Sequence, residues 1–162
     1  TWRWSGVPIY LRAGKRLPMT ATEVIVRLKP TPLAIFDEPA GGLSNYFRFR
    51  LSPEVVIATG TRVKQPGDDM VGESAELVAR HASGDTNLPY ERLLRDALRG
   101  DPALFTQDES VEAAWRVVEP MLDGTDSPVD YPSGTWGPPA ATTLIEDSNG
   151  WHNPAPEVSV PC

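Results

Sequence analysis

TEVIVRLK, residues 22–29, alternates apolar and polar side chains with a period of two. The run NYFRFRLS, residues 45–52, repeats this alternation, and a proline follows each run. Alternation over this length is typical of a strand that buries one face, here expected to be the apolar one. The apolar residues are Val24, Val26 and Leu28 in the first run and Phe47, Phe49 and Leu51 in the second, with Glu23, Ile25, Arg27, Lys29, Arg48, Arg50 and Ser52 opposite.

The remaining periodic segments predict three further strands followed by helices. A helical apolar stripe, with Pro89 in the first turn and Gly100 after the last, indicates a helix within 88–100. Because strands come first and helices after, the sequence predicts an α+β fold, a mostly antiparallel β-sheet packed against helices. The other expected elements are strands at 7–13, 54–63 (broken at Gly60) and 72–81, a helix at 107–122 and a short helix at 140–145.

Length and composition suggest one domain with a tail. The 162 residues include 17 prolines and 13 glycines, and 40% are hydrophobic. We expect a domain at 1–148 and an irregular, disordered tail at 149–162, where periodicity is lost. Because the first residue is Thr1 rather than Met, we interpret the chain as a fragment of something longer. A single cysteine, Cys162, is compatible with a reducing compartment.

Charge and motifs exclude several classes of function. The net charge is −7, divided into about +6 over residues 1–64 and about −13 over the rest, which argues against a nucleic-acid binder. No apolar run is long enough for a membrane span, so we expect no membrane partner and a cytoplasmic protein. The sequence has no glycine-rich nucleotide-binding turn. Its two histidines, His81 and His152, lie far apart, so we expect no metal site.

Basic residues are the remaining candidates for chemistry. GVPIYLRAGKRL, residues 6–17, ends a strand-like run with Lys15 and Arg16 together, and Arg12 lies close by. Cations converging from two strands, including Arg48 and Arg50, could clamp a phosphate through charge-assisted hydrogen bonds. The alternative is that these side chains simply face solvent, as long basic side chains mostly do.

Four sequence motifs add to the interpretation of the basic residues. They are RWSGVPIYLRAGKRL at the start, then Y-E-R-L-L-x-D-x-x-x-G-D, S-V-E-A-A-W-R-V-V-E-P and G-T-W-G-P-x-A, together spanning residues 3 to 140. In this order they resemble the C-terminal domain of glucose-6-phosphate dehydrogenase. The resemblance implies an antiparallel sheet with helices that follows an N-terminal dinucleotide-binding domain. It also implies oxidation of glucose 6-phosphate at C1, with hydride passing to NADP, in the pentose phosphate pathway.

The resemblance places the catalytic histidine and its aspartate upstream of this sequence. We therefore expect no catalytic residue here and no activity from the 162 residues alone. Lys15 matches a family lysine that contacts the sugar phosphate, and Gly14 before it would let the backbone turn. Thr20 stands where the family often has a second basic residue, and Ser52 stands where it has a glutamine near the substrate.

The resemblance also implies a cofactor contact. Arg12 and Arg50 resemble positions that bind a second, structural NADP in some members of the family, and Trp151 is the candidate stacking partner. Two other positions that are basic at that site appear here as Ala21 and Ile25.

The resemblance implies a homo-oligomer, dimer or tetramer, because the family dimerises through this sheet. One alternative is therefore a non-catalytic module that dimerises through its sheet and has no activity of its own. A weaker one is a solitary sugar-phosphate binder.

Overall fold

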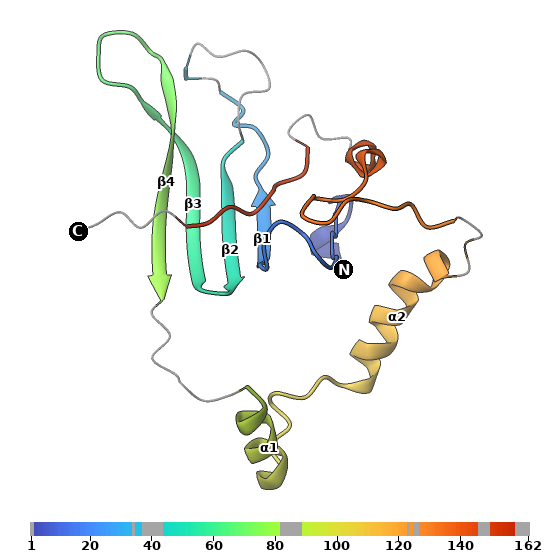
Figure 1. Cartoon of the computed structure of the whole chain (residues 1–162). Coiled ribbons are helices and arrows are strands. Elements are labelled where there is room, and N and C mark those ends of the chain that lie inside the picture. Colours follow the sequence, from blue (N-terminus) through green and yellow to red (C-terminus); the bar gives the residue numbers. More distant parts are fainter. Residues whose placement is uncertain are drawn as a thin grey trace. The chain divides into compact units, whose positions relative to one another are not determined.

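The structure is a computed structural model that describes most of the chain and divides it into two compact units (Figure 1). The sheet unit comprises residues 1–82 and 130–162, and the helical unit comprises residues 83–129. The described residues are 2–33, 35–36, 44–81, 89–122, 124, 127–145 and 150–157.

A four-stranded antiparallel sheet forms the centre of the sheet unit, with its strands in sequence order. Strands β1 and β2 come from the two alternating runs, and β2 to β4 follow one another as a meander. The α+β fold class and the antiparallel sheet are therefore confirmed. The strand bounds are Thr22–Arg27 for β1, Tyr46–Ser52 for β2, Val55–Lys64 for β3 and Gly72–His81 for β4.

The sheet buries the face opposite to the expected one. Arg48 and Arg50 are only 7% and 3% exposed, whereas Leu51 on the other face of β2 is 57% exposed. The register pairs these arginines with Ala58 and Val56, the buried apolar residues of the sheet. The expectation that the apolar face of these strands is the buried one is wrong. The reason is that the chain's own C-terminal segment covers the charged face, as described below.

Two strand predictions need correction. Residues 7–13 form no strand, because Pro8 lacks the amide that a ladder needs and Tyr10 packs edge-on against Trp151, with ring centroids 6.2 Å apart. Strand β3 is not broken at Gly60, which pairs with Tyr46 on one side and Glu76 on the other. A Cβ atom there would lie 2.1 Å from Cε1 of Tyr46, so glycine makes room for the ring that crosses it.

The helical unit contains α1, Pro89–Arg99, and α2, Asp108–Leu122, as expected. Helix α1 ends where Gly100 adopts φ +71, its amide donating to Ala97 and that of Asp101 donating to Asp96, both carbonyls of the last turns. The sheet unit adds two short 3-10 helices, η1 at Trp2–Trp4 and η2 at Pro139–Leu144, the second near the expected short helix. None of the helices described is long and apolar enough to cross a membrane.

Candidate functional site

The loop that carries Lys15 is held by a segment more than a hundred residues away. The Tyr131 hydroxyl donates to the Lys15 carbonyl at 2.9 Å, and the Gly134 amide donates to the Arg16 carbonyl at 2.8 Å. Arg16 has φ +54, so the left-handed turn falls on this residue and not on Gly14. These contacts fix the backbone directly after the Lys15 side chain, at two successive carbonyls.

Gly14 has a steric role and not the conformational one that we expected. Its φ is not in the left-handed region, but a Cβ there would lie 3.3 Å from both Leu17 Cδ2 and the Tyr131 hydroxyl oxygen. The glycine therefore permits the close approach of Tyr131 that braces the loop. Close backbone approach is a general use of glycine.

A small, mainly apolar cleft of about 220 Å³ adjoins this loop. The Lys15 side chain does not line it, although its neighbour Gly14 does. Lys15 is exposed, and no carboxylate of the described chain lies within ion-pair distance of it. Its ammonium group is thus available to an external anion. Residues that line the cleft include Leu11, Arg12, Leu17, Tyr131, Trp136 and Pro138.

Thr20 and Ser52 lie at one end of the sheet. Thr22, the first residue of β1, pairs with Ser52, the last residue of β2, and Thr20 is exposed two residues before β1. The structure therefore brings Thr20 and Ser52 to the same end of the paired strands β1 and β2, which we call the sheet edge. Lys15 lies on the segment that leads into this edge.

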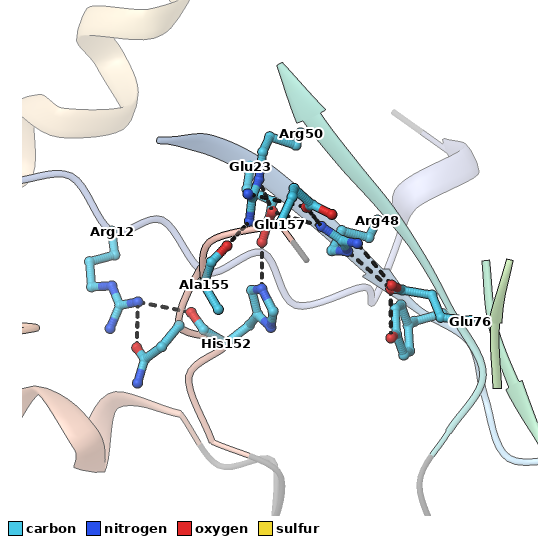
Figure 2. A network of polar contacts seen from close by, with 10 residues as sticks. Arg12, Glu23, Arg48, Arg50, Glu76, His152, Ala155 and Glu157 are labelled. Atoms are coloured by element: carbon cyan, nitrogen blue, oxygen red, sulfur yellow. Dashed lines mark hydrogen bonds and ion pairs between the residues drawn. The ribbon is translucent and has the colours of Figure 1, made fainter. Parts of the chain in front are cut away.

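The C-terminal segment, residues 150–157, crosses the charged face of the sheet (Figures 1 and 2). It has no regular secondary structure, but the sheet's arginines bind it at several points. Arg27 donates to the Gly150 carbonyl at 3.1 Å and Arg50 to the Ala155 carbonyl at 2.7 Å. The tail predicted from residue 149 is therefore in contact with the sheet over this part, and residues 158–162 lie outside the described chain.

Glu157 ends this segment among three arginines, which we call the arginine cluster: Arg48, Arg50 and Arg80. One carboxylate oxygen lies 2.5 Å from Arg48 Nη1 and 3.1 Å from Arg50 Nη1, and the other lies 3.5 Å from Arg80 Nη2. The Glu157 side chain is only 14% exposed. A largely buried carboxylate with several cationic donors is a strong, charge-assisted arrangement.

Two further carboxylates complete the network (Figure 2). Glu23, whose side chain is 2% exposed, accepts from Arg50 Nε at 2.8 Å, lies 3.4 Å from Arg48 Nη1 and contacts His152. Glu76 accepts from Arg48 Nε at 3.0 Å and Nη2 at 2.9 Å, and from the Tyr46 hydroxyl at 2.9 Å. Each guanidinium of strand β2 is thus bound on more than one edge.

These contacts shift the ionisation of their members. Hydrogen bonding to Glu76 raises the pKa of Arg48, and the same bonds lower the pKa of Glu76. The hydrogen bond from Arg48 lowers the pKa of Glu157. Burial, followed by the bond to Glu76, raises the pKa of Tyr46. The network therefore favours charged carboxylates and charged guanidiniums.

The Arg12 guanidinium lies close to two indole rings. Its Cζ atom is 4.7 Å from the ring centroid of Trp136 and 5.0 Å from that of Trp151. One of its amino groups donates at 2.8 Å both to the His152 carbonyl and to Asn153 Oδ1. Burial lowers the pKa of Arg12. The Trp151 ring is itself fixed, because its Nε1 donates to the Ala141 carbonyl at 2.7 Å.

Sequence reasoning did not find the carboxylates of this network. Glu23 was predicted only as a polar strand residue, although its register with Arg50 would follow once β1 and β2 were paired. No local signal points to Glu157, which lies 109 residues from Arg48 along the chain. Among the residues that the structure describes, no group of three potential ligands could hold a metal ion.

Comparison with known proteins decides the family. A sequence model of the glucose-6-phosphate dehydrogenase C-terminal domain matches residues 1–152. The chain belongs to the glucose-6-phosphate dehydrogenase family. Relatives named glucose-6-phosphate 1-dehydrogenase from Aggregatibacter actinomycetemcomitans and Mycolicibacterium smegmatis are 39% and 40% identical to it, each over 95% of this chain.

Solved structures of the glucose-6-phosphate dehydrogenase family share this fold. The glucose-6-phosphate 1-dehydrogenase of Mycobacterium avium matches 98% of this chain with a TM-score of 0.82 and 33% identity. A glucose-6-phosphate dehydrogenase in complex with glucose-6-phosphate matches 93% of it with a TM-score of 0.69 and 28% identity. The chain covers 34% and 32% of those two structures, and 32% and 33% of the two relatives. It thus spans about a third of their length.

Proposed function

We propose that this chain is the substrate-binding and oligomerisation part of an NADP-dependent glucose-6-phosphate dehydrogenase. The complete enzyme would oxidise glucose 6-phosphate to 6-phosphogluconolactone in the cytoplasm, as a step of the pentose phosphate pathway. The match of residues 1–152 to the family model, and of 98% of the chain to the fold of a glucose-6-phosphate 1-dehydrogenase, carries this proposal. In this proposal, hydride transfer and cofactor choice lie outside the third of the relatives' length that this chain spans.

Lys15 is the proposed contact for the sugar phosphate. Its support is the braced loop, in which the Lys15 and Arg16 carbonyls are both held, together with an ammonium group that pairs with no carboxylate among the residues that the structure describes. A preorganised cation binds an anion without the entropic cost of ordering the loop. Thr20 and Ser52 are proposed as neutral hydrogen-bonding residues at the neighbouring sheet edge.

The proposal is tested by the appearance of NADPH absorbance when the full-length protein receives glucose 6-phosphate and NADP. We expect turnover by the full-length protein and none by the 162 residues alone. Turnover by the isolated 162 residues would contradict the proposed division of labour. Failure of the full-length protein to use glucose 6-phosphate would contradict the proposed substrate.

A second role, association through the sheet, has its own support. The face of the sheet opposite the arginine cluster exposes apolar side chains, among them Phe47 at 39%, Leu51 at 57% and Ile57 at 49%. Contiguous exposed apolar residues on a sheet face mark association surfaces. The proposed partner is a second copy of the chain, giving a dimer or a tetramer.

Sedimentation of the full-length protein tests this role. Ile57→Glu, at the centre of the apolar face, should shift the protein toward the monomer. The matched control is Leu98→Glu, which changes a 90% exposed leucine of helix α1 and should leave the distribution unchanged. A distribution that Ile57→Glu does not alter would remove the sheet face from the interface.

A further inference from the structure

The two arginines that the resemblance assigns to a second NADP are already bound to the chain itself. Arg12 lies over two indole rings, and one of its amino groups is shared between the His152 carbonyl and Asn153 Oδ1. Arg50 gives its Nε to Glu23 and one amino group to the Ala155 carbonyl. A dinucleotide that used these two guanidiniums would first have to displace the C-terminal segment.

Glu157 takes the place that an external anion would need. It brings one carboxylate to the three guanidiniums of the arginine cluster, which come from two strands, β2 and β4. Convergent guanidiniums of this kind bind phosphate and carboxylate by the same charge-assisted hydrogen bonds. A side chain of the same polypeptide has no translational freedom to lose on binding, so it competes well with a dissolved anion.

Among the described residues, carboxylates of the chain itself match the charges of the arginine cluster. The arginine cluster contributes three positive charges, and Glu23, Glu76 and Glu157 contribute three negative ones. A phosphate added to this network would lie close to Glu23, whose side chain is 2% exposed. Like charges in a poorly solvated site repel strongly. The residues therefore do not fit a second dinucleotide while the segment is in place.

We infer that the C-terminal segment, residues 150–157, is a built-in ligand of the arginine cluster and of Arg12 that replaces a second dinucleotide. Glu157 supplies the anion for the cluster, while Trp151, His152 and Asn153 supply the stacking surface and acceptors for Arg12. This arrangement goes beyond the proposed reaction, because it concerns how the sheet is completed and not how substrate is bound.

Hydrogen exchange of the full-length protein, measured by mass spectrometry with and without NADP or inorganic pyrophosphate, tests this inference. In the wild-type protein we expect neither ligand to change exchange in residues 150–157. In Glu157→Gln, the loss of the carboxylate charge should make the segment exchange at least about tenfold faster. The unbalanced cluster should then accept pyrophosphate, which would slow exchange in β2 of this variant only.

Two further variants keep the test decisive. Glu73→Gln removes an exposed carboxylate from the opposite face of β4 and should behave like the wild type. If Glu157→Gln does not fold, Arg12→Lys keeps the charge but loses the stacking and the paired donors, and should speed exchange at 151–153. Faster exchange of residues 150–157 in the wild-type protein on addition of NADP or pyrophosphate would overturn the inference. Unchanged exchange of the segment in Glu157→Gln, or in Arg12→Lys where that variant stands in, would overturn it too.

Discussion

Replacing Glu23 by glutamine should weaken the sheet more than any other change of one carboxylate. Its side chain is 2% exposed and it faces two guanidiniums, those of Arg48 and Arg50, besides His152. Glutamine keeps the shape and one acceptor oxygen, but it has no charge and its amide group would point a donor at a donor. Breaking a buried ion pair by removing one partner costs about 3–5 kcal/mol.

We expect the lower end of that range, because Glu76 and Glu157 still bind Arg48. A loss of about 3 kcal/mol corresponds to roughly 150-fold faster hydrogen exchange of amides that open with β1 and β2. The assay is exchange of the full-length protein under conditions where opening is at equilibrium. Glu73→Gln is the control, since that carboxylate is exposed on the other face. An increase of less than about threefold would refute the view that buried charge pairs hold these strands.

Two other changes in the same sheet should alter the stability of the protein. The pKa of Glu76 and that of Glu157 are lowered in the fold from the ordinary value of 4.5. Their stabilisation is therefore present above that pH and is lost as the pH falls through the lowered values. Glu157→Gln should flatten the loss of stability on acidification, and an acid unfolding curve that this change leaves unaltered would contradict this. Gly60→Ala should cost about 2 kcal/mol by forcing Tyr46 off its position, and urea unfolding that shows a neutral change would contradict the close packing of that ring.

Local sequence patterns predict where strands and helices form better than they predict which distant residues those elements contact. Alternation located β1 and β2, and the apolar stripes with Pro89 and Gly100 located α1. The apolar run at 7–13 predicted a strand that does not form, and Tyr10 in this run contacts Trp151 instead of a neighbouring strand. Propensity within a short window contains no information on a partner that lies far along the chain.

Which face of the sheet is buried also depends on contacts that are distant in the sequence. Apolar residues are normally the buried ones, so Phe47 and Leu51 were expected inside. Arg48 and Arg50 are buried instead, because Glu23, Glu157 and the C-terminal segment satisfy their charge and their donors. Charge compensation across more than a hundred residues leaves no periodic signal in the sequence.

The Lys15 loop was predicted in part. The resemblance pointed to the lysine, and the structure gives it an exposed ammonium on a braced backbone. The brace itself, formed by Tyr131 and Gly134, was not foreseen, because its two halves lie 116 residues apart at the Tyr131–Lys15 bond. The predicted role of Gly14 is wrong. Gly14 avoids a steric contact with Leu17 and Tyr131, whereas the left-handed turn falls on Arg16.

The most direct test of the proposed function is the KM for glucose 6-phosphate of full-length Lys15→Ala. Losing one charged phosphate contact of about 2 kcal/mol predicts a KM roughly 30-fold higher, with kcat little changed. Lys29→Ala, which removes an exposed lysine just after β1, should leave KM at the wild-type value. A Lys15→Ala enzyme whose KM equals that of the wild type would contradict the assignment of Lys15 to the substrate phosphate.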